Sequence, residues 1–199
     1  MTVSIVTALG RDGIIGVGAE LPWPRIPADM KFFSELTADG IVIMGRKTWD
    51  SIPAKIRPLP GRINVIITRN PNFFPEHHDD VHVYRAFSRD VIRDLQDAYP
   101  GKDVFIIGGA EIYKTALTER LFDFAYITRV GCPEEQFKGP EHGERVYFPE
   151  DLLINHADII RTRELTKTPF SCVVEFYKPI DSSNSKNRDI ADPPHVGPI

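Results

Sequence analysis

Short apolar runs recur along the chain and predict the strands of a sheet. Nearly continuous runs, which are typical of strands buried on both faces of a parallel sheet, lie at 3–9, 41–44 and 103–107. Further predicted strands lie at 63–68, 81–84 and 124–130. Apolar and polar residues alternate at 155–163 and 170–177, which predicts two closing antiparallel strands.

Helices are predicted between these strands. Proline suits the first helical turn, so a helix should begin at Pro27, run to Glu35 or Leu36 and end before Gly40. Another is predicted over 90–98, where Val91, Leu95 and Ala98 form one apolar stripe. Two more helices should begin directly after glycines, at Gly45 and Gly109.

Two long segments have no regular pattern. Residues 10–23 are rich in glycine, and we expect a mobile loop that overlies a binding site. Residues 131–145 form a polar loop to which we assign no chemistry. From Asp181 onward there are too few apolar residues for a core, so we expect one domain over 1–180 and a disordered tail or linker over 181–199.

Composition narrows the class of protein. A chain of 199 residues suits one domain, and its net charge of −4 gives no reason to expect nucleic acid as a partner. No apolar run approaches the roughly 20 residues of a membrane span, and the N-terminus does not resemble a signal peptide. Cys132 and Cys172 lack metal-ligand spacing, and His77 and His78 lie in a polar loop. We therefore expect a cytoplasmic protein with free thiols, no membrane partner and no metal.

Asp29 admits two interpretations. In the first turn of a helix, its charge could simply complement the positive end of the helix dipole. Alternatively, the carboxylate lies in a pocket with Trp23 and Phe33, partly desolvated and ready to hold a proton or a cationic ligand.

A second set of residues favours phosphate binding. Gly45 to Thr48 follow a buried strand and open a helix, so free N–H groups and two cationic side chains meet at the carboxyl edge of the sheet. Together with Thr68 and Arg69, Arg46 could bind the ribose 2′-phosphate that distinguishes NADPH from NADH. A solvated helix start is the alternative. Gly108 and Gly109 would let a ligand approach the backbone, or permit a strained or cis peptide bond.

The segment 51–62 alternates basic residues with prolines and aliphatics. A stiff, apolar, positively charged loop suits a ligand with an aromatic body and a carboxylate tail, whereas a surface connector is the plain alternative.

These motifs, in this order, resemble dihydrofolate reductase. The resemblance covers Val3 to about Lys178, through Leu-Pro-Trp, Pro-Ala-Asp, Met-Gly-Arg-Lys-Thr-Trp-Asp-Ser-Ile, Arg-Pro-Leu-Pro-Gly-Arg and Ile-Ile-Gly-Gly-Ala-Glu-Ile-Tyr. It implies an α/β fold in which an eight-stranded, mostly parallel, twisted sheet with an antiparallel C-terminal strand is flanked by helices. It also implies NADPH-dependent reduction of dihydrofolate to tetrahydrofolate, a step that supports thymidylate synthesis.

The resemblance also implies the site. The catalytic residues would be Asp29, Trp23 and Leu21. Substrate would contact Val6, Asp29, Phe33, Ile52, Leu59, Arg62 and Thr128. NADPH would contact Ala8, Ile15, Gly16, Arg46, Lys47, Thr48, Thr68, Arg69, Ile107, Gly108, Gly109, Ala110, Glu111 and Ile112, with a cis bond between the paired glycines. Glu111 departs from the pattern, because many bacterial members carry a cation there.

Partners and rivals follow from the same resemblance. Antifolates such as methotrexate would inhibit the enzyme, which would act as a monomer or as a domain fused to thymidylate synthase. The nearest rival is the riboflavin-pathway pyrimidine reductase of the same fold, which does not place an Asp at position 29. The second rival is a non-catalytic NADPH-binding module.

Overall fold

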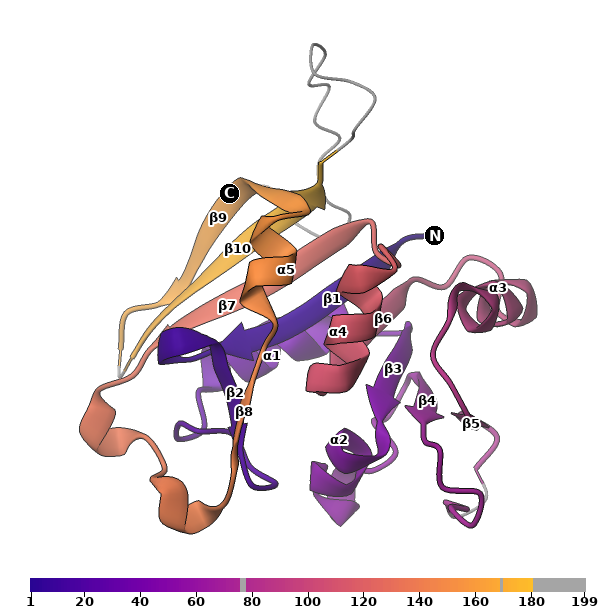
Figure 1. Ribbon diagram of the computed structural model, residues 1–199, viewed down its shortest axis with the longest axis horizontal. Coiled ribbons are helices and arrows are strands. Elements are labelled where there is room, and N and C mark those ends of the chain that lie inside the picture. The colour runs from indigo at the N-terminus through magenta and orange to yellow at the C-terminus, as the bar shows by residue number, and fades with distance from the viewer. Residues whose placement is uncertain (76–77, 169, 181–199) are drawn as a thin grey trace.

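The computed structural model describes residues 1–75, 78–168 and 170–180, and its main feature is an eight-stranded sheet (Figure 1). The strand order is β5-β4-β3-β6-β1-β7-β10-β9. The strands are β1 (Val3–Leu9), β3 (Ile41–Gly45), β4 (Ile63–Ile67), β5 (Val81–Tyr84), β6 (Val104–Gly108), β7 (Phe124–Gly131), β9 (Ala157–Thr166) and β10 (Ser171–Pro179). Only parallel pairs join β5 through β7, and β10 runs antiparallel to both of its neighbours. The predicted fold class is confirmed.

Helices cover both faces of this sheet. They are α1 (Pro27–Leu36), α2 (Arg46–Ser51), α3 (Arg89–Ala98), α4 (Ala110–Thr118) and α5 (Glu150–Ile154). Pro27 opens α1 as predicted, and the side chain of Ser88 caps α3 by accepting a hydrogen bond from the Val91 N–H. In Figure 1, α3, α4 and α5 lie in front of the sheet, whereas α1 lies behind it.

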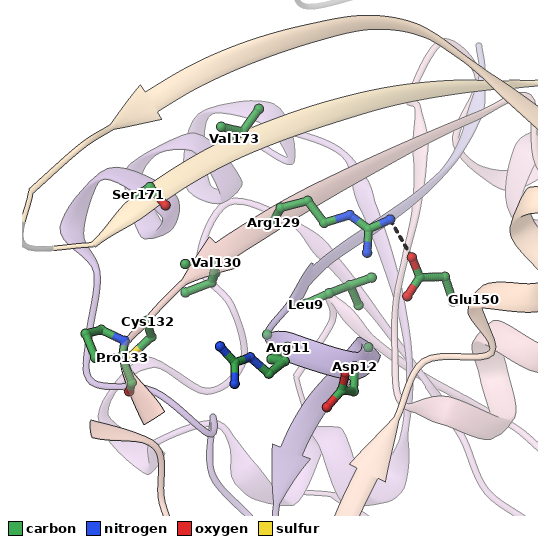
Figure 2. A pocket seen from close by; sticks show the side chains of 13 residues that line it. Leu9, Arg11, Asp12, Arg129, Val130, Cys132, Pro133, Glu150, Ser171 and Val173 are labelled. Atoms are coloured by element: carbon green, nitrogen blue, oxygen red, sulfur yellow. Dashed lines mark hydrogen bonds and ion pairs between the residues drawn. The ribbon is translucent and has the colours of Figure 1, made fainter. Parts of the chain in front are cut away.

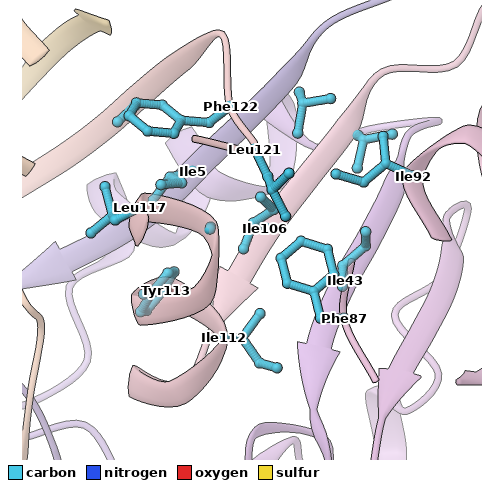
Figure 3. Close-up of a cluster of buried hydrophobic side chains, with 14 of the residues drawn as sticks. Ile5, Ile43, Phe87, Ile92, Ile106, Ile112, Tyr113, Leu117, Leu121 and Phe122 are labelled. Atoms are coloured by element: carbon cyan, nitrogen blue, oxygen red, sulfur yellow. The ribbon is translucent and has the colours of Figure 1, made fainter. Parts of the chain in front are cut away.

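Two hydrophobic clusters explain why the central strands are continuously apolar. One lies between the sheet and helices α3 to α5, with Ile5, Ile43 and Ile106 fully buried at its centre (Figure 3). The other lies under α1 and α2 and includes Leu36, Trp49 and Phe105. A strand between two such layers has no water-exposed face, so it carries no polar alternation.

The glycine-rich segment is more ordered than the sequence predicts. Arg11–Gly13 form a 3₁₀ turn, and β2 (Ile14–Val17) pairs antiparallel with β8 (Arg145–Tyr147) in a small second sheet. The prediction of irregular structure over 14–17 is therefore wrong, and neither β8 nor α5 was expected. The strands are short and their partners are far apart in sequence, so local periodicity cannot reveal the pairing.

The polar segment 131–145 supports this glycine-rich segment. The Lys138 N–H donates to the Pro22 carbonyl at 2.8 Å, and the Lys138 ammonium pairs with the Glu20 carboxylate. The Gly18 N–H donates to the Glu144 carbonyl at 2.9 Å. A loop to which the sequence assigned no role thus holds the approach to Trp23 in place.

Two expectations fall on residues that the structure does not describe. The tail or linker over 181–199 lies outside the described residues, as does His77. Within the described ranges, no helix is long and apolar enough to cross a membrane.

Candidate active site

The carboxyl edge of the sheet carries a topological switch. The chain leaves β1 and β3 toward α1 and α2 on one face, and leaves β6, which lies between them, toward α4 on the other face. Connections that diverge in this way open a crevice at the strand ends, where open α/β sheets bind ligands.

Three of the predicted cofactor positions meet in this crevice. A Cβ added at Gly109 would lie 3.4 Å from the Thr48 Oγ1, and one added at Gly45 would lie 3.8 Å from the Gly108 carbonyl oxygen. The first turns of α2 and α4 therefore adjoin, and glycines leave their backbones accessible. The Gly108–Gly109 peptide bond is cis, which confirms that expectation.

Gly108 is required for steric reasons. Its φ is +104°, and a Cβ there would lie 2.7 Å from the ring of Tyr113. The Tyr113 hydroxyl donates to the Val6 carbonyl at 2.9 Å, so this buried ring joins α4 to β1 directly behind the crevice. Sequence reasoning did not single out Tyr113, because it reads as one member of an apolar helix stripe.

The predicted cationic residues differ in their surroundings. Arg46 Nη1 lies 2.6 Å from the Asp50 Oδ2, whereas the exposed Arg69 forms no hydrogen bond or ion pair with another described residue. The buried Thr68 Oγ1 accepts a hydrogen bond from the Asn70 N–H at 3.2 Å. Lys47 is exposed at the start of α2.

The remaining cofactor positions surround these groups. Ala110 and Glu111 form the first turn of α4, but the Ile112 side chain is buried in the core in front of the sheet. Ile15 and Gly16 belong to β2, and Ile15 packs against the same core. The structure therefore gives the Ile112 side chain a packing role, and its contact with a cofactor stays a prediction.

Asp29 lies in the first turn of α1, partly buried, and accepts a hydrogen bond from the hydroxyl of Thr128 on β7. Burial raises the pKa of Asp29, and the bond from Thr128 opposes that rise without cancelling it. Because desolvation dominates, the structure favours the interpretation of Asp29 as a carboxylate in an apolar pocket.

Trp23 packs with Cys172, a residue close enough to Asp29 to feel its charge. It is 3% exposed and belongs to a cluster with Ile26 and Cys172, against which Ala8 also packs. Phe137 meets the Trp23 ring edge-on, with 6.3 Å between ring centroids. Leu21, two residues earlier, is 46% exposed.

Burial, with the charge of Asp29 adding to it, raises the pKa of the Cys172 thiol to about 11. Cys172 is therefore a neutral neighbour of the carboxylate at physiological pH.

The predicted substrate walls come together in the cluster under α1 and α2. Its members include Val6 and, partly buried, Phe33, Ile52 and Leu59, together with Ile107, which was predicted to contact the cofactor. These residues come from β1, α1, β6 and the loop before β4, so only the tertiary fold makes them neighbours. Phe33 lies one helical turn after Asp29 on α1, so this apolar cluster begins beside the carboxylate.

Arg62 is a buried cation held in one orientation. Its Nε donates to the Thr37 Oγ1 at 2.9 Å, and its Nη groups donate to the carbonyls of Ser34 and Pro60. No carboxylate among the described residues pairs with it. Although burial lowers the pKa of Arg62, a guanidinium remains charged at any physiological pH. The site therefore offers a preoriented guanidinium to an anionic ligand group.

Asn64 is a further residue that sequence reasoning missed. Its fully buried side chain accepts from the Leu59 N–H at 2.9 Å and donates to the carbonyls of Leu59 and Arg62, both at 3.0 Å. A polar residue inside the apolar strand at 63–67 was the available signal. Asn64 fixes the turn that carries both Leu59 and Arg62.

A separate pocket of about 730 Å³ lies beside α5 and the ends of β1, β7 and β10 (Figure 2). None of the predicted site residues lines it. Arg129 pairs there with Glu150 at 2.5 Å and with Glu175 at 2.7 Å, so its charge is already neutralised. Among the described residues, no group of three or more His, Cys, Asp or Glu could hold a metal ion.

Comparisons with known proteins agree with this geometry. Residues 2–151 match the family described as dihydrofolate reductase. The dihydrofolate reductase of Mycobacterium tuberculosis is 38% identical over 115 residues, which are 58% of this chain and 64% of that protein. The bifunctional dihydrofolate reductase-thymidylate synthase of Daucus carota is 37% identical over 138 residues, 65% of this chain and 26% of that protein. These alignments thus span less than two thirds of either relative.

A solved structure extends the likeness across most of the fold. Dihydrofolate reductase from Enterococcus faecalis, complexed with NADP(H) and RAB-propyl, superposes with a TM-score of 0.72 at 27% identity. The match covers 90% of this chain and 97% of that chain.

Proposed function

Since this chain belongs to the dihydrofolate reductase family, we propose that it reduces 7,8-dihydrofolate to 5,6,7,8-tetrahydrofolate with NADPH. The reaction adds a hydride to C6 and a proton to N5 of the pterin, and leaves NADP⁺. Of the rivals, neither the riboflavin-pathway reductase nor a non-catalytic module is favoured by a feature of the site.

The observation that carries this proposal is the environment of Asp29. A partly desolvated carboxylate with a raised pKa, held by Thr128 beside an apolar surface, suits a flat ring that carries an amino group and a ring N–H. Asp29 would accept hydrogen bonds from both of these groups and favour protonation at N5. Trp23 would limit access of water to the carboxylate.

The rest of the cleft matches the remainder of the substrate. Val6 and Phe33 would sandwich the pterin, and Ile52 and Leu59 would line the aminobenzoyl group. Arg62 would pair with the α-carboxylate of the glutamate. Its prior hydrogen bonds to Thr37 and Ser34 support this role, because a preoriented guanidinium loses little entropy on binding.

The crevice at the switch fits NADPH, because glycines without a Cβ precede α2 and α4, whose first turns carry free N–H groups that suit phosphates. When bound, NADPH supplies the hydride. Lys47, Thr48, Thr68 and Arg69 would hold its phosphates, with Arg46 nearby. Ala8, Ile15, Gly16 and Leu21 would surround the nicotinamide, and residues 107–112 would support the pyrophosphate and nicotinamide through the first turn of α4.

The direct test is the fall in near-ultraviolet NADPH absorbance when purified protein meets dihydrofolate. We expect a fall that methotrexate blocks and that Asp29→Asn largely abolishes while NADPH still binds. Glu35→Gln, an exposed change on the same helix, is the matched control and should retain activity. Turnover of a ribosylaminopyrimidine alone, or NADPH binding without turnover of any pterin, would overturn the proposal.

We further propose that the protein acts in the cytoplasm, as a monomer or as one domain of a longer chain with thymidylate synthase. The bifunctional name of the carrot relative supports the second arrangement. Light scattering of the purified chain during size-exclusion chromatography would test the monomer, and a dimer mass would contradict it.

A further inference from the structure

Three arginines follow three neighbouring parallel strands at the carboxyl edge. Gly45, Ile67 and Tyr84 end β3, β4 and β5, and they lie in one row of the sheet because Gly45 pairs with Ile67 and Ile67 with Tyr84. Arg46 and Arg85 come directly after that row, and Arg69 one residue later. Adjacent strands lie about 4.8 Å apart, so the three arginines begin within about 10 Å of one another at this edge.

The three arginines are not equivalent. Arg46 is paired with Asp50, and Arg69 forms no hydrogen bond or ion pair within the described part of the chain. Arg85 instead donates to two main-chain carbonyls, those of Asn70 at 2.6 Å and Pro71 at 3.2 Å. The two Nη groups of Arg85 thus bridge the turn that follows Arg69.

That turn is built around Thr68 and Asn70. The Asn70 N–H donates to the Thr68 Oγ1 at 3.2 Å, and the Asn72 N–H donates to the Asn70 Oδ1 at 3.0 Å. The Thr68 N–H donates to the Tyr84 carbonyl at 3.0 Å, next to Arg85. Arg85 therefore closes a turn whose first two residues are Thr68, which carries a hydroxyl, and Arg69, which carries the guanidinium.

We propose that Arg85 is a positioning residue that sets selectivity for the 2′-phosphorylated dinucleotide, by holding the turn that presents Thr68 and Arg69. This inference rests on the proposed function. Arg69 would contact the phosphate directly. Arg85 would fix the turn from which the Arg69 side chain extends, and so the direction in which that side chain approaches the phosphate. Because Asp50 already neutralises the charge of Arg46, Arg46 would contribute less to this selectivity than Arg69.

Lysine cannot replace arginine in this role. Its ammonium is a point charge on a flexible stem, whereas the planar guanidinium can donate to two carbonyls in a fixed geometry. A lysine at position 85 would keep the local positive charge but would not bridge Asn70 and Pro71. The Arg85→Lys variant therefore separates the effect of positioning the turn from the long-range effect of the positive charge.

The test measures binding of 2′,5′-ADP and 5′-AMP, which differ by the 2′-phosphate alone, by calorimetry. Arg85→Ala should weaken binding of 2′,5′-ADP by about tenfold, because the charge-assisted contact of Arg69 would be misplaced, and should change binding of 5′-AMP by less than about twofold. Arg85→Lys should recover only part of the loss. Arg89→Ala is the matched control, because Arg89 is also exposed and donates to two carbonyls, those of Glu119 and Arg120 beyond the far end of α4.

Equal loss of both nucleotides, no loss, or full recovery in Arg85→Lys would overturn the inference. Failure of the proposed function is recognised separately, in the unmodified protein, as absent turnover of dihydrofolate. Nucleotide selectivity can be measured whether or not a pterin is reduced, so the two failures are distinguishable.

Discussion

The hydroxyl of Thr128 on β7 donates a hydrogen bond to the carboxylate of Asp29 on α1. This bond joins two elements that lie about a hundred residues apart in sequence, and it opposes the effect of burial on the pKa of Asp29. The carboxylate is therefore kept closer to its ionised form than its apolar surroundings alone would allow.

Removing this donor should raise the pKa of Asp29. We expect Thr128→Val, which has nearly the same shape, to move the titration of Asp29 to higher pH and to lower the free energy of unfolding by about 1–2 kcal/mol. The midpoint can be followed by NMR of the labelled carboxyl group. Thr128→Ser keeps a hydroxyl and should stay close to the original midpoint; an unmoved midpoint in the valine variant would contradict the assignment.

Asp29 should cost stability at neutral pH. Its folded-state pKa is raised, so the folded protein binds this proton more tightly than the unfolded chain. The stabilising contribution of the bound proton is complete below pH 3.8, the ordinary pKa of an aspartate, and is lost as the pH rises through the higher pKa of the folded state. We expect Asp29→Asn to melt about 2–4 °C higher than the original protein at pH 7, with the difference narrowing toward pH 4.

Calorimetric scans across this pH range would check the prediction for Asp29. Glu35→Gln, at an exposed position of the same helix, should leave the melting temperature unchanged. A lower melting temperature for Asp29→Asn at pH 7 would show that burial of the charge is not the dominant effect.

Asn64 should control substrate binding through the turn at 59–62. Asn64→Asp keeps the acceptor for the Leu59 N–H but turns a second carboxylate oxygen toward the carbonyls of Leu59 and Arg62. We expect the KM for dihydrofolate to rise by about tenfold or more, with a loss of about 2–3 kcal/mol in unfolding free energy. The KM for NADPH should change much less.

Steady-state kinetics with each substrate varied in turn would measure this split for Asn64→Asp. The control is Asn155→Asp, at an exposed helix end, which should alter neither constant. If both KM values rose together, the change would reflect general disruption rather than the turn.

Gly108 should tolerate no side chain. Gly108→Ala would bring a Cβ to 2.7 Å from the Tyr113 ring in addition to imposing a positive φ on alanine. Gly101 also has a positive φ, but a Cβ there would meet nothing within 4 Å. Gly101→Ala therefore measures the backbone cost alone, about 1 kcal/mol, and Gly108→Ala should lose about 2 kcal/mol more. Urea unfolding of both variants would test this, and equal losses would contradict the steric argument.

Much of the fold could be read from local patterns. Continuous apolar runs located the strands of the main sheet within a few residues, and Pro27 marked the start of α1. The order of the motifs was enough to expect the fold class and the cis bond between Gly108 and Gly109. Such features depend on neighbouring residues, so the sequence carries them directly.

Local patterns therefore sufficed to indicate which segments form strands and helices, and which residues carry chemistry at their ends. The folded chain alone reveals four further features, which are the pairing of β2 with β8, the burial of Ile112, the ion pair of Arg46 with Asp50 and the turn held by Asn64. These outcomes depend on side-chain direction or on partners distant in the chain. Periodicity records which face of an element is apolar, but it does not record which distant group that face will meet.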